Sequence, residues 1–247
     1  MITKDDLTIV YYTSNFLDTA QPHFLANVEQ QLIKASGDLP IVIVSQKPTM
    51  FGENSTNVVV GDIGRSHLNI YRQILIGCKN AKTPYVAMAE DDILYSFEHF
   101  HSNLPKHDDT FLYDMNKLSV FTWTKPPLFS FRHNRMVVNQ LIAPREMLIE
   151  ALEERFAKVE ELKSKGRDEA SIIKYFGDPG RYEALLGVTP RKTDTFMCTC
   201  PSIVFSHEHA YGYLSQGKKK RLGDLRIVEV PFWGRAEDMM KVFDEQT

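Results

Sequence analysis

The stretch that decides the fold is Tyr85-Val-Ala-Met-Ala-Glu-Asp-Asp92, an apolar run that ends in three consecutive acids. The run predicts a buried strand over residues 85–89. Three neighbouring carboxylates repel one another unless a cation or a hydroxylated ligand is present. Open α/β sheets bind ligands outside the carboxyl ends of their strands. The triplet Glu90–Asp92 therefore predicts a ligand site in preference to a solvated acidic turn.

The residues before this stretch alternate strand-like and helix-like segments. Apolar residues recur at spacings of three and four over 25–35 and again over 68–78, which predicts two amphipathic helices. Ser66 can cap the second of them. Continuous apolar runs predict strands over 7–12, 41–45 and 57–61. This alternation is typical of a mostly parallel sheet covered by helices.

The rhythm changes in the second half of the chain. Short aromatic segments predict mixed or antiparallel strands over 111–113, 118–123 and 137–142, and the longest helix signal runs from Pro144 to just before Gly166. The tail reads as irregular, with short strands over 203–205 and 227–230. The predicted fold class is α/β, with a mostly parallel central sheet flanked by helices and a smaller mixed or antiparallel region, in a single domain over 1–247.

Composition narrows the function classes. The 29 basic and 32 acidic residues give a net charge of -3, so a general nucleic-acid-binding surface is excluded and any polyanion contact must be local. The odd count of three cysteines, with Cys198 and Cys200 too close for an ordinary disulfide, favours reduced thiols. No signal-peptide pattern or apolar run of about eighteen residues is present. We expect a soluble, cytoplasmic protein.

Four segments resemble the nucleotide-sugar glycosyltransferases of the GT-A fold, and most closely the large inverting family conventionally numbered two. They are Ile9-Val-Tyr-Tyr-Thr13, Gly64-Arg65-Ser66, Arg72-Gln73 and the strand with its acids over 85–92. The spacing from Arg72 to Asp92 matches that family's, and the resemblance covers roughly residues 7 to 100. It implies a Rossmann-like GT-A fold in which residues 1–100 bind the nucleotide sugar. Residues 101–247 would bind the acceptor and carry a metal and diphosphate loop.

The resemblance also implies a chemistry. Members hold Mn²⁺ or Mg²⁺ on the acidic motif, and the cation neutralises the diphosphate leaving group of a donor such as a UDP-sugar. Carried over, Asp92 is the direct metal ligand, Asp91 approaches the donor ribose or the metal, and Glu90 is a further metal candidate. This chain reads Glu-Asp-Asp where Asp-X-Asp is common, so the resemblance leaves open which of the three acids binds the metal and which contacts the donor.

A second motif is His207-Glu-His209, followed by Lys218-Lys-Lys-Arg221 with glycines between. Some enzymes of this fold close the metal site with a C-terminal histidine, which makes His207 a candidate ligand. Glycines beside cations suit a mobile loop that closes over a diphosphate, with Lys218 and Arg221 as contacts. The alternative is an ordinary solvated face.

An inverting transfer needs a carboxylate base to take the proton from the attacking hydroxyl. Asp178 and Glu183 lie near where the related family places its base, and Asp194 is a third option. We favour Glu183, although a retaining enzyme would need no such base.

Thr13 and Arg65 are candidates for the nucleotide and Arg72 for the diphosphate, against capping or surface ion-pair roles. An acceptor groove is expected among aromatic and basic residues of the second half, unless they only pack: Trp123, Phe129, Phe131, Trp233, Arg132 and Arg135.

We expect a hydroxyl acceptor, either a glycan or a hydroxymethylated pyrimidine in DNA, as soluble phage-type enzymes of this broad class use. Two rival functions remain. A nucleotidyltransferase should carry a glycine-rich phosphate loop after the first strand, and Thr13-Ser-Asn-Phe-Leu17 is not one. A non-catalytic module that binds a nucleotide or a sugar would keep the pocket and tolerate loss of the acids.

Overall fold

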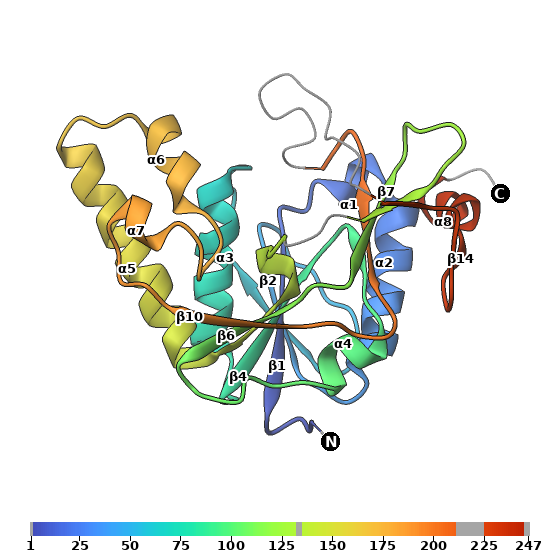
Figure 1. The fold of residues 1–247 in the computed structure, drawn as a ribbon, viewed down its shortest axis with the longest axis horizontal. Coiled ribbons are helices and arrows are strands. Elements are labelled where there is room, and N and C mark those ends of the chain that lie inside the picture. Colours follow the sequence, from blue (N-terminus) through green and yellow to red (C-terminus); the bar gives the residue numbers. More distant parts are fainter. Residues whose placement is uncertain (1, 132–134, 211–224, 245–247) are drawn as a thin grey trace.

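The computed structural model describes residues 2–131, 135–210 and 225–244, and its core is a seven-stranded sheet of order β10-β6-β9-β4-β1-β2-β3 (Figure 1). Strand β9 runs antiparallel to its neighbours β4 and β6, and every other pair in the sheet is parallel. The strands are β1 (Leu7–Thr13), β2 (Ile41–Ser45), β3 (Ser55–Val59), β4 (Tyr85–Glu90), β6 (Thr110–Asp114), β9 (Leu141–Pro144) and β10 (Lys192–Phe196).

A second, five-stranded sheet has the order β12-β8-β7-β11-β5. It contains β5 (Ile93–Leu94), β7 (Lys117–Phe121), β8 (Phe129–Phe131), β11 (Ser202–Ser206) and β12 (Leu225–Ile227), and a ribbon of β13 (Glu229–Val230) and β14 (Gly234–Arg235) follows. Only Asp91 and Asp92 separate β4 from β5. The acidic triplet therefore lies where the chain leaves the central sheet and enters the second one.

Helices cover both faces of the central sheet. The helices α3 (His67–Asn80) and α5 (Arg145–Ser164) lie on one side, and α2 (Pro22–Ser36) and α4 (Phe97–His101) lie on the other (Figure 1). The remaining helices are α1 (Leu17–Ala20), η1 (Val138–Gln140), α6 (Glu169–Phe176), α7 (Glu183–Leu186) and α8 (Ala236–Phe243). None of the helices among the described residues is both long and apolar enough to cross a membrane.

The two layers follow from the strand period. Ile9 and Tyr11 of β1 point into the core shared with α2, whereas Val10 and Tyr12 point into the core shared with α3 and α5. Helix α3 starts where predicted, because the Ser66 side chain accepts a hydrogen bond from the backbone N–H of Asn69. Helix α3 is joined to the carboxyl end of β1 by the Gln73 side-chain amide, which donates to the carbonyl of Thr13 at 2.7 Å.

The predicted fold class is confirmed: a mostly parallel α/β sheet flanked by helices, with a smaller mixed sheet beside it. Several details differ, and one is that residues 138–140 of the strand predicted over 137–142 form η1 and the strand begins only at Leu141. The strand predicted over 57–61 lies two residues earlier, because its partner β2 pairs with Ser55–Val59. The second half also supplies β6, β9 and β10 to the central sheet. The tail that we expected to be irregular holds β10 and α8, whose short segments gain their stability from tertiary packing.

Helix α3 packs so closely on β1 that Gly77 leaves no room for a side chain. A Cβ at Gly77 would lie 2.3 Å from Val10 Cγ1. We predict that Gly77→Ala lowers the free energy of unfolding by about 1–3 kcal/mol, although alanine is the better helix former. Denaturant titration measures this loss. Adding Val10→Ala should give a total loss smaller than the sum of the two single losses, and a Gly77→Ala protein more stable than wild type would contradict the packing argument.

Candidate functional site

A pocket opens at the carboxyl ends of β1 and β4. Six of the residues that the sequence singled out line it: Thr13, Arg65, Glu90, Asp91, Asp92 and His207. The other lining residues are Tyr12, Ser14, Phe16, Leu17, Gly64, Ser66, Asn69, Ile70, Gln73, His209 and Ala210. The predicted site residues from four separate parts of the chain thus meet in one place.

Strand pairing explains why they meet. Strands β1 and β4 are parallel neighbours with Tyr12 opposite Glu90, so both strands end at the pocket. After the triplet, β5 pairs antiparallel with β11, and the backbone N–H of Phe205 donates to the carbonyl of Asp92 at 2.9 Å. The residue that follows β11 is His207. Sheet geometry therefore brings His207 beside the acids.

Glu90 is held by the protein through both of its carboxylate oxygens. The Tyr12 hydroxyl donates to Oε1 at 2.8 Å, and the Asn139 side chain donates to Oε2 at 2.6 Å. These contacts tie the end of β4 to β1 and to η1. They favour a positioning role for Glu90 over the metal-binding role that the sequence proposed for it.

Asp91 lies against the end of β1. Its Oδ2 accepts a hydrogen bond from the Thr13 hydroxyl at 2.6 Å, and Thr13 itself is buried. Burial raises the pKa of Asp91 above its ordinary value, while the Thr13 hydrogen bond and the charge of Arg65 act in the opposite direction. Thr13 therefore orients the carboxylate that the nucleotide and metal predictions share.

His207 is only 1% exposed and closes the side of the pocket formed by the second sheet. Its ring packs on Phe24 and Phe243, with centroids 5.7 and 5.4 Å away. His209 lies 6.2 Å from it, centroid to centroid, and also lines the pocket. Apolar packing therefore fixes the His207 ring next to the acidic triplet.

Arg65 joins three segments at the pocket. Its guanidinium lies 4.1 Å from the centroid of the Phe16 ring, and its Nη2 donates to the carbonyl of His209 at 2.5 Å. Phe16 follows β1, Arg65 precedes α3, and His209 follows β11. Among the described lining residues Arg65 is the one permanent cation, so it is suited to bind an anionic ligand.

Sequence reasoning missed the partners that hold these groups. Asn139 belongs to no motif, and only the fold brings η1 to Glu90. Phe16 could have been found from its place three residues after Thr13, at the end of the first strand. His209 stood in the His-Glu-His motif, and its backbone carbonyl contributes as well as its ring.

Several predicted residues lie outside this pocket or, like Arg132, outside the described residues. Arg72 donates to Asn69 at 2.7 Å and lies over the Phe156 ring, which stabilises α3 and its neighbour α5. Asp194 is exposed on the edge strand β10. Lys218 and Arg221 fall within 211–224, outside the residues described.

Two of the aromatic residues that we expected to line an acceptor groove pack in the core of the second sheet instead. Phe129 is fully buried in the core of the second sheet. Trp233 packs against the same core, and its indole N–H donates to the carbonyl of Pro201 at 2.7 Å. Both contacts agree with ordinary packing, the alternative that the sequence left open.

The two candidate bases anchor neighbouring loops. Asp178 Oδ1 accepts from the Tyr71 hydroxyl at 3.1 Å and from the backbone N–H of Val138 at 2.8 Å. Glu183 is 7% exposed, and its Oε1 lies 2.8 Å from Nη2 of the fully buried Arg155. Neither carboxylate lines the pocket. The arrangement favours a structural role for Glu183 over the catalytic role predicted for it.

Further negative charge surrounds the acids. Burial, with the charges of Asp18 and Asp91, raises the pKa of Glu29 on α2 from 4.5 to about 7. Each carboxylate makes the others harder to ionise, and a bound cation would relieve this repulsion. The chemistry of the pocket therefore favours a positively charged ligand next to the acids.

The negative charge around Glu29 makes the stability of the fold depend on pH. Between pH 4.5 and about 7 the folded chain holds a proton on Glu29 that the unfolded chain has released, so the free energy of unfolding falls as the pH rises. We predict that Glu29→Gln, in a chelator, raises the melting temperature at about pH 8 and changes it little at about pH 5. Glu53→Gln, at an exposed site, is the control. An equal shift at both pH values would contradict this electrostatic explanation.

The buried ion pair gives a test of the role of Glu183. Removing one partner of such a pair leaves a buried charge, so Arg155→Met should cost about 3 kcal/mol of unfolding free energy, measured by denaturant titration. The exposed pair of Lys192 and Asp109 is the control, and Lys192→Met should change stability by less than about 1 kcal/mol. Glu183→Gln should also lower stability. Full stability with lost sugar transfer would instead identify Glu183 as a catalytic base.

No protein-family model matches the chain, and no curated protein matches it. Solved structures give distant likenesses. The glycosyltransferase GlyE of Streptococcus pneumoniae TIGR4 is 11% identical over 77% of this chain, with a TM-score of 0.43, and the chain spans 45% of that protein's length. The galactosyltransferase LgtC, solved with donor and acceptor sugar analogues, is 10% identical over 68% of this chain and 69% of its own, with a TM-score of 0.40.

A nucleotidyl transferase from Methanothermobacter thermautotrophicus is 9% identical over 60% of this chain and 76% of its own, with a TM-score of 0.35. Both kinds of transferase are thus similar to this chain in structure, at a distance that does not decide between their activities.

Proposed function

We propose that this chain is a metal-dependent glycosyltransferase that moves a sugar from a nucleotide diphosphate donor, a UDP-sugar, to a hydroxyl acceptor. The observation that carries the proposal is the convergence of Thr13, Arg65, Asp91, Asp92 and His207 in one pocket at the strand ends. Open α/β sheets bind nucleotides at this position.

The donor set suits a divalent cation. Carboxylate oxygens and a neutral imidazole are ligands for Mn²⁺, and carboxylates also serve Mg²⁺. We assign Asp92 and His207 to the cation and Asp91 to the cation or the donor ribose, while Glu90 positions the strand end. When bound, the cation would neutralise negative charge on the departing diphosphate.

Arg65 supplies the charge for the donor phosphates. A guanidinium binds phosphate through paired, charge-assisted hydrogen bonds. Its contacts with Phe16 and with the His209 carbonyl hold it at the pocket, so little side-chain entropy would be lost on binding. In our proposal Lys218 and Arg221, which lie outside the described residues, add further phosphate contacts.

The stereochemistry and the acceptor are proposals of the same kind. For an inverting transfer we retain Asp178 over Glu183 as base. Asp178 accepts from Val138, and the adjacent Asn139 donates to Glu90, so Asp178 is linked to the triplet through η1. Both carboxylates are paired with a guanidinium, Asp178 with Arg181 at 3.2 Å and Glu183 with the buried Arg155 at 2.8 Å, but only Asp178 has this link to the triplet. The acceptors to screen are glycans and DNA that contains hydroxymethylated pyrimidines.

The test is a thermal-shift panel of nucleoside diphosphates and nucleotide sugars, with and without Mn²⁺, on wild type and Asp92→Ala. A ligand that binds the folded state raises its melting temperature. We predict that one nucleotide sugar stabilises the wild type by several degrees only when Mn²⁺ is present, and that Asp92→Ala loses the shift. Asp5→Ala removes an exposed carboxylate before β1 and should keep it.

The panel also separates the rival functions. Release of a nucleoside diphosphate from the stabilising sugar nucleotide is expected of a glycosyltransferase. Binding without release, in the presence of acceptors, would support a non-catalytic binding module. A shift by nucleoside triphosphates alone would support a nucleotidyltransferase. No shift with any ligand would overturn the proposal.

A further inference from the structure

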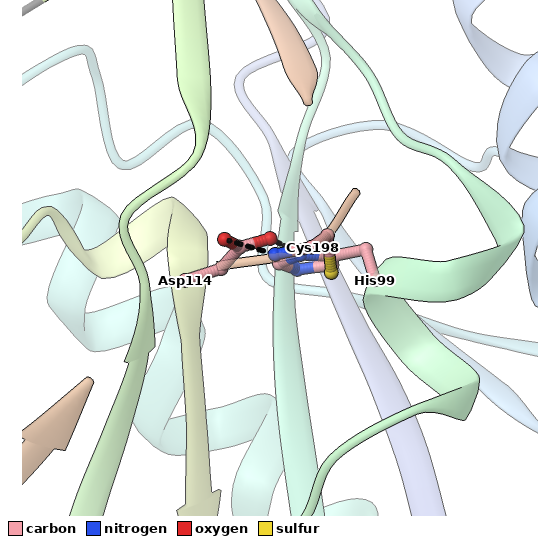
Figure 2. Close-up of side chains that lie close together, drawn as sticks. All are labelled: His99, Asp114 and Cys198. Atoms are coloured by element: carbon pink, nitrogen blue, oxygen red, sulfur yellow. Dashed lines mark hydrogen bonds and ion pairs between the residues drawn. The ribbon is translucent and has the colours of Figure 1, made fainter. Parts of the chain in front are cut away.

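A second polar cluster lies in the interior, apart from the pocket. It consists of His99 on α4, Asp114 at the end of β6, and Cys198 in the segment between β10 and β11 (Figure 2). His99 and Asp114 are fully buried, and Cys198 is 2% exposed. None of the three lines the pocket at the acidic triplet. The proposed sugar transfer therefore does not involve these three residues.

The three side chains converge closely enough to share an ion. His99 Nδ1 lies 3.0 Å from Asp114 Oδ2, and one potential ligand atom from each residue lies within 4.8 Å of the other two. Ligand atoms of a tetrahedral zinc site are roughly 3.3–3.7 Å apart, given its usual bond lengths. Small side-chain rotations would close the remaining gap. Figure 2 shows the three groups directed toward one another from three separate segments.

One atom of this cluster is left unexplained by the fold. His99 Nε2 is buried and has no hydrogen-bond partner among the described residues, while Nδ1 faces Asp114. A buried polar atom without a partner costs about 1–3 kcal/mol. Rings that contact His99 belong to Tyr95, Phe100 and Phe196, and these offer no hydrogen bond to Nε2. A metal ion bound at Nε2, after a turn of the ring, would give this atom a partner and would fix the tautomer of the imidazole.

We propose that His99, Asp114 and Cys198 bind a structural Zn²⁺ ion. The charges balance, because one divalent cation with one carboxylate, one thiolate and a neutral imidazole is neutral overall, as a fully buried site requires. On binding, the Cys198 thiol gives its proton to solvent and a sulfur–zinc bond forms, with no change in oxidation state. The Ser102 hydroxyl lies 3.9 Å from Cys198 Sγ and offers a neutral oxygen as a fourth ligand.

The position of the cluster indicates what a bound ion would stabilise. The backbone N–H groups of Asn116 and Cys198 both donate to Asp114 Oδ1, at 2.9 and 3.3 Å, where the chain passes from β6 to β7 and from β10 to β11. The site therefore joins the central sheet to the second sheet. Because β11 leads to His207, the zinc site would also hold that residue in position for the donor pocket.

The experiment uses the full-length protein. We expect metal analysis of the purified wild type to find one zinc per chain, and we expect the cobalt-substituted protein to show the intense near-ultraviolet band of thiolate-to-cobalt charge transfer. Cys198→Ser should lose both signals. Cys200→Ser, two residues along the chain, and Cys78→Ser, buried in another core, should keep both. A metal held only by the carboxylates and histidine of the pocket would show no sulfur band, so the two sites are distinguishable.

A measurement on the wild type guards against a variant that fails to fold. Removing zinc with a strong chelator should lower the melting temperature by several degrees, and Zn²⁺, but not Mg²⁺, should restore it. Wild-type protein that retains no zinc and shows no cobalt–thiolate band while folded would overturn the proposal, because the cluster would then be a hydrogen-bonded anchor only.

Discussion

The rest of the site depends on the hydrogen bond that the Tyr12 hydroxyl donates to Glu90. It links the next-to-last residue of β1 to the last residue of β4, and Asn139 donates to the other oxygen of the same carboxylate. With Glu90 fixed, the next two residues must leave the central sheet in a set direction, and β5 then pairs with β11. That pairing brings His207 to the acids. One fixed glutamate therefore converts the junction of two sheets into a pocket.

Electrostatics then decides what the pocket can hold. Asp91, Asp92 and the nearby Glu29 concentrate negative charge at a partly buried place, and burial raises the pKa values of Asp91 and Glu29. A cation relieves this repulsion, and an anionic diphosphate would then be attracted by the cation together with Arg65. A second set of proposed metal ligands, His99, Asp114 and Cys198, is buried in the interior of the protein. Softer sulfur and full burial suit a structural ion there, whereas open carboxylates suit an exchangeable one at the pocket.

Local sequence patterns predicted most of the first half of the fold, because β1, β2, β4, α2 and α3 each have a clear apolar pattern. Strand β3 was predicted two residues late and α1 was not predicted, since neither has such a pattern. Local patterns also singled out Thr13, Arg65, Asp91, Asp92 and His207, which lie together in the pocket, since strand ends and motif residues are visible in the chain. What the sequence could not predict depends on long-range contacts. Asn139 belongs to no motif, and only the fold brings it to Glu90. Arg155, which pairs with Glu183, likewise has no signal of its own in the sequence. The short strand β10 is likewise defined only by its pairing with β6.

The central claim is that the acids and His207 form one cation and nucleotide site. The most direct measurement is a crystal structure with Mn²⁺ and a nucleoside diphosphate, examined through the anomalous scattering of manganese. The account predicts an anomalous peak within bonding distance of Asp92 and His207, with the diphosphate between the cation and Arg65. Well-ordered crystals that bind the nucleotide elsewhere, or that show manganese away from the triplet, would contradict it.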